Sequence, residues 1–171
     1  RDLFRSSYVG GIFINKQSDG GNYNRTFGVD GHFQFFKHLE IASLLLKTDT
    51  PGLEENDTSF DAFVGWEDDR YKIEADYLSI EDNFNPEVGF VRRTGIRKSR
   101  GEFNLKFWPR EEVSWIRQIT PSTGIEYISD QENRVKSKDF DQTLSIQLED
   151  GGSIGLTHRV RFERLDEPFF I

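Results

Sequence analysis

Glu74 and Asp76 are the carboxylates whose spacing comes nearest to a catalytic arrangement in this sequence. They are two residues apart, and in an extended strand this places them on one face with backbone positions roughly 7 Å apart. Inverting glycosidases hold two carboxyl groups about 6.5–9.5 Å apart, so the pair is a candidate for glycoside hydrolysis. Any charged strand face yields such pairs, and Lys72 shares this one. We therefore prefer to interpret the three residues as part of a solvated polar wall.

Metal-binding signals are weak throughout the chain. The histidines His32, His38 and His158 follow no recognised metal-binding spacing, and the sequence contains no cysteine. A catalytic zinc site generally needs three protein ligands and a structural site four. The loops Asp19–Asn22 and Asp49–Asp57 offer oxygen ligands without the spacing of an EF-hand. No phosphate-cradling glycine motif and no nucleophile elbow is present. We expect no metal and no cofactor.

A basic cluster lies in the second half of the chain. Its members are Arg92, Arg93, Arg97, Lys98 and Arg100. Such a cluster can meet an anion or a lipid headgroup, but we prefer a polar wall in which neighbouring acids neutralise it. The chain has 30 acidic and 22 basic residues, for a net charge of −8, which argues against a general affinity for nucleic acid.

The stretch Phe60–Arg93 indicates which elements carry these side chains. Apolar residues recur at every second position from Phe60 to Trp66 and again from Tyr71 to Tyr77. A strand directs successive side chains to opposite faces, so each segment has one apolar face and one more polar face. Asp68-Asp69 forms the connection between them. Each arm has roughly ten residues, whereas a usual strand has about 5–6, and this length favours a membrane-spanning sheet.

Trp66, Tyr71 and Tyr77 belong to the apolar side of this hairpin. In a membrane barrel, aromatic residues at such positions form girdles at the boundary between lipid and water. In a soluble β-sandwich the same residues would cap the core, because Tyr and Trp suit any half-wet boundary. The aromatics alone leave both interpretations open.

The remaining chain shows the same alternation and no confident helix. We expect about ten strands, and they cover residues 6–16, 24–37, 38–48, 60–67, 71–77, 88–93, 102–108, 113–130, 140–148 and 154–163. Residues 131–138 are expected to be a charged loop, and Asp150-Gly151 is a hairpin signal. No apolar run reaches the roughly 18 residues that a spanning helix needs. The prediction is one all-β domain over residues 1–171, an antiparallel meander forming part or all of a transmembrane-type barrel.

Two segments carry a resemblance to a known family: YNRTFGVDGHFQF (Tyr23–Phe35) and FNPEVGFVRR (Phe84–Arg93). They resemble a bacterial family of unknown function in which a module similar to a family 9 carbohydrate-binding domain precedes a predicted outer-membrane β-barrel. The opening SYVGGIFINK and the ending ERLDEPFFI resemble its barrel region as well. The resemblance implies the barrel part alone, with the amino-terminal module or further strands of the same protein missing, since family barrels are longer.

The leading hypothesis is a non-enzymatic barrel in the bacterial outer membrane, in contact with its lipid and involved in passage or capture of a carbohydrate-like solute. The residues expected to face its lumen are Lys72, Glu74, Asp76, Arg159, Arg161 and Glu163. One alternative is a secreted or periplasmic β-sandwich that binds glycans, with the same apolar side facing an internal core. A glycoside hydrolase that uses Glu74 and Asp76 is the other alternative.

Overall fold

The computed structural model describes residues 6–18, 20–109 and 113–165, and these residues form an all-β fold. The strands are β1 (Tyr8–Gln17), β2 (Tyr23–Phe35), β3 (Leu39–Asp49), β4 (Thr58–Glu67), β5 (Tyr71–Ile80), β6 (Ile96–Leu105), β7 (Ile116–Asp130), β8 (Val135–Leu148) and β9 (Ser153–Glu163). Within these ranges there is no helix of the length and apolar character needed to cross a membrane.

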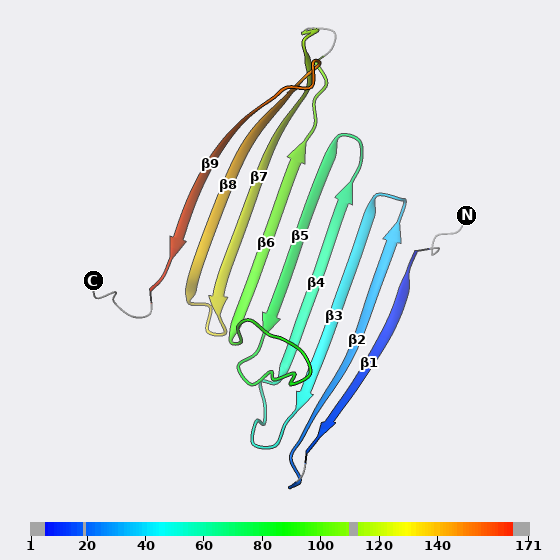
Figure 1. The fold of residues 1–171 in the computed structure, drawn as a ribbon, viewed down its shortest axis with the longest axis vertical. Helices are drawn as coiled ribbons and strands as arrows, with labels where there is room; N and C mark the ends of the chain where they lie inside the picture. Colours follow the sequence, from blue (N-terminus) through cyan, green and yellow to red (C-terminus); the bar gives the residue numbers. More distant parts are fainter. Residues whose placement is uncertain (1–5, 19, 110–112, 166–171) are drawn as a thin grey trace.

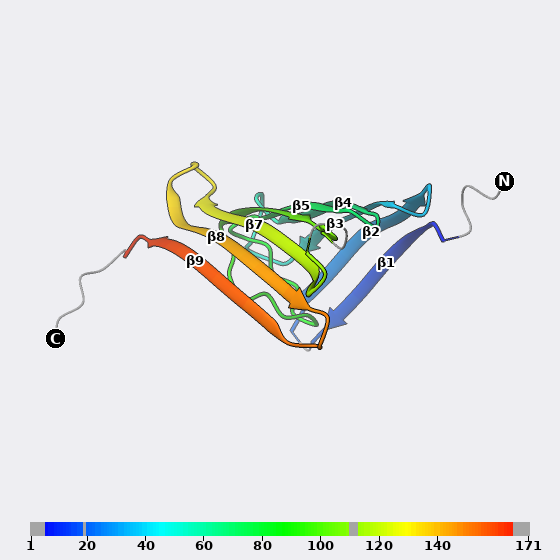
Figure 2. The ribbon, with the colours of Figure 1, turned by 90° about the horizontal axis from the view of Figure 1, so that it is seen from above.

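The strands form a single sheet in the order of the chain, and each strand pairs antiparallel with the next. The expected antiparallel meander is confirmed, with nine strands in the described residues. The ends of successive strands are progressively offset (Figure 1), and the sheet seen from above is an open arch (Figure 2). β1 and β9 form its two edges. This open, curved sheet is consistent with part of a barrel.

Turn chemistry explains several of the connections. Phe36 and Lys37 have φ values of 53° and 67° between β2 and β3. Between β8 and β9 the expected Asp150-Gly151 hairpin is present, and Gly151 has a φ of 90°. A backbone of that kind suits glycine because it has no Cβ. At the end of the sheet opposite the connection between β5 and β6, three connections are short: residues 36–38, 68–70 and 149–152. Residues 106–115 form a longer connection at the same end.

Three expected segments differ from the structure. The strand expected over residues 102–108 is β6, which begins earlier, at Ile96, and ends at Leu105. Residues 88–93 form no strand; they belong to the connection between β5 and β6, which contains the Asn85-Pro86 dipeptide and a tight turn in which Gly89 N–H donates to the Pro86 carbonyl at 2.8 Å. Residues 131–138 are not all loop, since β8 begins at Val135. Charged residues follow Val135 closely, at Lys136, Lys138 and Asp139, and in the sequence alone such a segment is typical of a loop.

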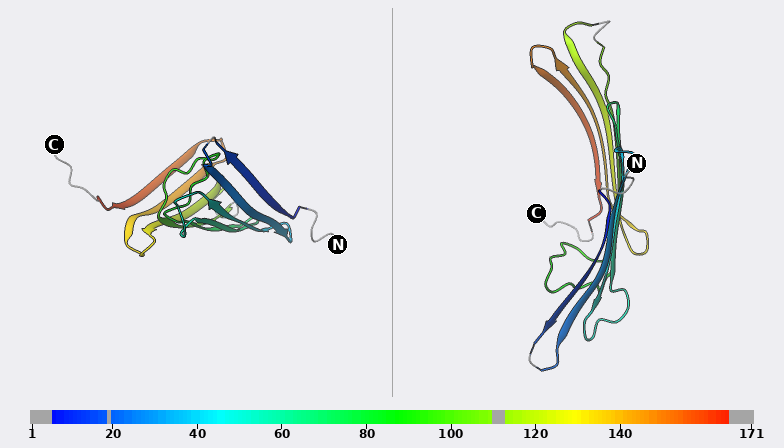
Figure 3. Two further views of the ribbon diagram at one scale, coloured as in Figure 1. Left: turned by 90° about the horizontal axis from the view of Figure 1, so that it is seen from below. Right: turned by 90° about the vertical axis from the view of Figure 1, so that its right-hand side faces the viewer.

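Side-chain polarity divides the sheet into two faces. The connection between β5 and β6 lies on the concave side, whereas the connection between β3 and β4 projects from the convex side (Figure 3). Register places Lys72, Glu74 and Asp76 on the concave face and the alternating apolar residues of β5 on the convex face. The convex face is apolar and exposed, which is the reverse of a soluble sheet that covers its apolar side.

Most of the large apolar side chains of the convex face are exposed. They are Val9, Phe13, Phe27, Val29, Ile41, Leu45, Phe60, Val64, Trp66, Tyr71, Ile73, Tyr77, Phe103, Ile125, Leu144, Ile154, Leu156, Val160 and Phe162. The chain exposes 12436 Å², whereas a compact monomer of 19.9 kDa exposes about 8,700 Å². Among the described residues, buried apolar side chains are limited to Ile116 and a small cluster of Ile80, Phe84 and Ile96 on the concave face.

Candidate functional site

Rows of polar side chains cross the concave face from β5 to β9. One row contains Glu74, Glu102, Gly124, Asp141 and Arg159. The next contains Asp76, Arg100, Glu126, Asp139 and Arg161. Opposed residues in an antiparallel sheet point to the same side, so distant strands contribute to one surface. All six residues expected to face a lumen share this face, including Lys72 and Glu163 in the flanking rows.

Ion pairs connect neighbouring strands on this surface. Lys98 Nζ lies 2.7 Å from Glu126 Oε2, and Arg161 Nε lies 3.4 Å from Asp139 Oδ2. Arg159 pairs in the same way with Asp141. These side chains are partly exposed, so each pair contributes little to stability. Their main effect is to fix a mixed-charge surface that can hydrogen-bond a polar solute.

A shallow hollow of about 320 Å³ lies on the concave face over β6, β7 and β8. Its polar lining is Arg100, Glu102, Asn104, Ser122, Glu126, Asp139, Asp141 and Thr143. Within it, Arg100 Nη2 lies 3.0 Å from Glu102 Oε2, and Asn104 Nδ2 donates to Glu102 Oε1 at 2.9 Å. Most binding pockets are predominantly apolar, whereas this hollow is lined mainly by polar and charged residues. It is therefore better suited to a hydrated, hydroxyl-rich solute than to an apolar one.

The hydrolase candidates lie on one face of β5, as their spacing predicts. Glu74 Oε1 is 3.0 Å from Lys72 Nζ, and Asp76 lies opposite Arg100 of β6. Both carboxylates thus belong to the charged rows described above. Neither carboxylate has surroundings that distinguish it from the other acidic residues of the concave face.

The three histidines lie apart from one another. His32 Nε2 is 3.0 Å from Glu40 Oε1 on the concave face, and His38 Nδ1 lies 2.8 Å from the carbonyl oxygen of Glu67 in the turn region. His158 is opposite Gln142 on the convex face. In the described part of the chain, no group of three or more His, Cys, Asp or Glu side chains could hold a metal ion.

The connection between β5 and β6, residues 81–95, folds across the concave face; we call it the inward loop. Asn24, only 1% exposed, donates through Nδ2 to the Asn85 carbonyl at 2.7 Å. Its Oδ1 accepts the Glu87 N–H at 3.2 Å. Lys16 Nζ reaches Glu87 Oε2 at 2.8 Å from β1. The loop therefore spans the sheet from β6 to the first hairpin.

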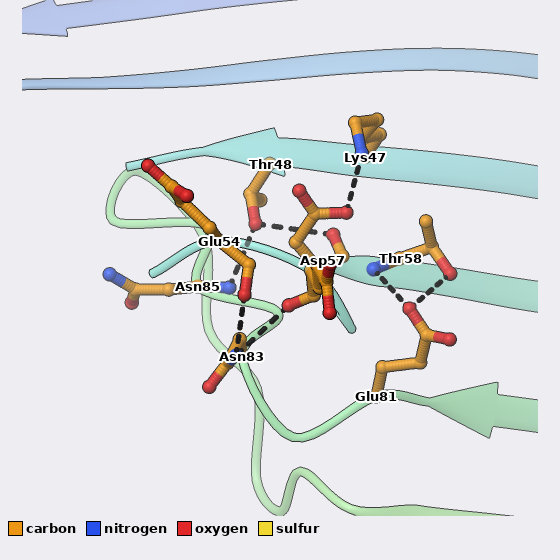
Figure 4. A network of polar contacts seen from close by, with 9 residues as sticks. Lys47, Thr48, Glu54, Asp57, Thr58, Glu81, Asn83 and Asn85 are labelled. Carbon is orange, nitrogen blue, oxygen red and sulfur yellow. Dashed lines mark hydrogen bonds and ion pairs between the residues drawn. The ribbon is translucent and has the colours of Figure 1, made fainter. Parts of the chain in front are cut away.

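The first half of the inward loop is fixed by further contacts (Figure 4). Glu81 Oε2 accepts the Thr58 N–H at 2.8 Å and its hydroxyl at 2.7 Å. Asn83 Nδ2 donates to the Glu55 carbonyl at 2.9 Å, and Asn85 N–H donates to the hydroxyl of buried Thr48 at 3.1 Å. These bonds satisfy backbone groups that would otherwise lose water on burial.

Phe84 anchors the loop by hydrophobic contact. It is 4% exposed and packs with Ile80 and Ile96, against which Leu46 and Val91 also lie. The spacing of residues in the sequence does not predict this arrangement. Two segments singled out in the sequence, Tyr23–Phe35 and Phe84–Arg93, meet here through the hydrogen bond from Asn24 Nδ2 to the Asn85 carbonyl.

Charge and aromatic residues mark the two ends of the convex face. The charged side chains that register places on it are Arg25, Lys47, Asp49, Arg97 and Lys138. Each lies within three residues of the strand end nearest the inward loop. Trp66 and Tyr71 lie at the opposite end, as expected, whereas Tyr77 lies nearer the inward loop, paired with Ala62 and Ser99. An uncharged apolar band separates the two ends.

Asp68, in the turn between β4 and β5, provides a prediction on pH. It accepts hydrogen bonds from Trp66 Nε1 at 2.9 Å and from the backbone N–H groups of Tyr71 at 2.7 Å and Arg70 at 2.8 Å. These bonds hold the pKa of Asp68 below its ordinary value. Its contribution to stability is thus present above the unfolded pKa of about 3.9 and is lost as pH falls through the lower folded pKa.

We therefore expect Asp68→Asn to lower the thermal unfolding midpoint at pH 7 relative to the wild type. The difference should shrink as the pH falls from 5 to 2, because the wild-type carboxylate becomes protonated. Asp69→Asn changes a neighbouring carboxyl and serves as the control, with little expected effect. A deficit in Asp68→Asn that stayed constant across this range would contradict the assigned role.

No protein-family model, no curated protein and no solved structure matches this chain.

Proposed function

We propose that this chain forms part of the wall of a bacterial outer-membrane β-barrel, without enzymatic activity, through which a carbohydrate-like solute passes or is captured. The observation that carries the proposal is the reversed polarity of the sheet. Its convex face leaves large apolar side chains exposed in a continuous band with charged residues at one end, whereas most charged residues of the strands lie on the concave face. Transmembrane barrels have this pattern, with an apolar exterior and a polar interior.

The geometry favours this proposal over a soluble sandwich. A sandwich buries its apolar faces between two packed sheets, but the described residues form one sheet. Trp66, Tyr77, Leu144 and Val160 are all exposed on the convex face rather than interdigitated in a core. Soluble monomers rarely expose contiguous apolar patches beyond roughly 300–600 Å². Lipid is the environment that suits this face.

The proposal requires partners for the two edges. β1 and β9 each have one neighbour among the described strands, and an edge of that length offers unpaired backbone groups. Inside a membrane such groups must be satisfied, so further strands of the same protein would close the barrel, and in vesicles that hold this chain alone the edges of neighbouring copies would pair instead. The concave rows would then line its lumen, and the inward loop would narrow it.

Vesicle flotation tests the membrane assignment. The chain is diluted from urea into plain buffer or into phosphatidylcholine vesicles and then centrifuged through a density gradient. We expect β-structure in the floating vesicle fraction after a carbonate wash, and aggregation in plain buffer, because the convex face needs an apolar solvent. A folded monomer in buffer that fails to float with vesicles would refute the proposal.

A further inference from the structure

The inward loop, which lies over the concave face, leaves one aromatic side chain almost fully exposed. Phe90 is 89% exposed, although the loop residues on both sides of it are fixed. Glu87 is hydrogen-bonded to Asn24 and ion-paired with Lys16, and Val91 packs against the buried cluster. Because these contacts hold the backbone on both sides of Phe90, a ligand that binds the ring orders few additional residues, and the loss of conformational entropy on binding is small.

Two arginines follow Phe90 closely in the sequence of the inward loop. Arg92 and Arg93 are exposed, and no hydrogen bond or ion pair engages either guanidinium within residues 6–18, 20–109 and 113–165. Most other arginines of the concave face have acidic partners, as Arg100, Arg159 and Arg161 do. A free guanidinium is suited to a carboxylate, with which it forms paired, charge-assisted hydrogen bonds.

We propose that Phe90, Arg92 and Arg93 form a binding site for an anionic saccharide on the inward loop. The flat face of Phe90 would contact the C–H face of a sugar ring, and the arginines would bind its carboxylate. This site deepens the proposed function, on which it rests, by assigning the solute class.

Calorimetry with a tetramer of galacturonic acid, and with its neutral methyl ester, tests this site. The chain is reconstituted in vesicles whose flotation is measured in the same preparation. We expect the acid to bind about tenfold or more tighter than the ester. Arg92→Gln combined with Arg93→Gln should abolish that preference, and Phe90→Ala should weaken both ligands about tenfold. Phe36→Ala and Arg70→Gln, at the opposite end of the sheet, should change neither affinity.

Labelling provides a second readout at the same loop. The chain has no cysteine, so Val88→Cys introduces a single exposed thiol beside the site. A maleimide should label it in vesicles, and the tetramer should slow the labelling. Three results would each overturn the site: no binding of either tetramer, wild-type affinities in the Phe90→Ala and Arg92→Gln/Arg93→Gln variants, or a thiol at position 88 that the maleimide cannot reach. If the chain also failed to float, the membrane assignment itself would be wrong; a floating chain that binds no tetramer refutes the saccharide site alone.

Discussion

Replacing Val64 with arginine is expected to prevent stable insertion of the chain into vesicles. Val64 is 43% exposed on the convex face of β4, between Ile41 and Ala75, away from the charged end of that face. An arginine on the lipid face near the bilayer midplane of a barrel costs about 2–4 kcal/mol. The measurement is the free energy of unfolding by urea in phosphatidylcholine vesicles, compared with the wild type.

Thr143→Arg is the matched control for this prediction. Thr143 lies on the concave face of β8, in the row next to Asp141, where a cation meets water and acidic neighbours. This variant should insert almost as well as the wild type. If Val64→Arg and Thr143→Arg lowered the free energy of unfolding equally, the convex face would not be in contact with lipid while the concave face is in contact with water. The barrel proposal would then fail.

Truncating Phe84 to alanine is expected to release the inward loop while the sheet persists. Removal of a buried phenylalanine side chain typically costs about 3–5 kcal/mol, and here that loss falls on the contact that docks the loop. Hydrogen exchange should show residues 81–95 losing protection. Trypsin should cleave after Arg92 and Arg93 at least about a hundredfold faster than in the wild type.

Phe36→Ala separates this effect from a general loss of aromatic surface. Phe36 is an exposed turn residue at the opposite end of the sheet and should leave loop protection unchanged. Two results would contradict the docking role of Phe84: unchanged protection of residues 81–95, or simultaneous loss of protection in the loop and every strand. The second result would mean that the loop and the sheet unfold as one unit.

Alternation in the sequence predicted the sheet well because side-chain direction has a period of two. The hairpin from Phe60 to Tyr77 and the strand from Phe140 to Leu148 were identified by that pattern, including which residues share a face. Residues 135–138 were assigned wrongly to a loop because Lys136 and Lys138 lie near the start of β8, with Lys138 at the charged end of the convex face. Charge near a strand end is thus ambiguous in sequence alone.

The inward loop could not be predicted for a different reason. Val88–Arg93 alternates as a strand does, but six residues are too few to distinguish a strand from a loop without knowing their contacts. Its position depends on Phe84 packing against Ile80 and on Asn24 bonding to Asn85, which is 61 residues away in the chain. Contacts at such a separation leave no periodic signal.

The odd number of strands limits how this sheet can close. In a nine-stranded meander over the described residues, β1 and β9 run in the same direction. Direct closure would therefore join them as a parallel pair. A second copy related by a twofold axis along the pore would again bring β9 against β1 in parallel. A perpendicular twofold axis would restore antiparallel pairing but would turn one copy upside down across the bilayer. An odd number of additional strands from a longer chain satisfies both pairing and sidedness.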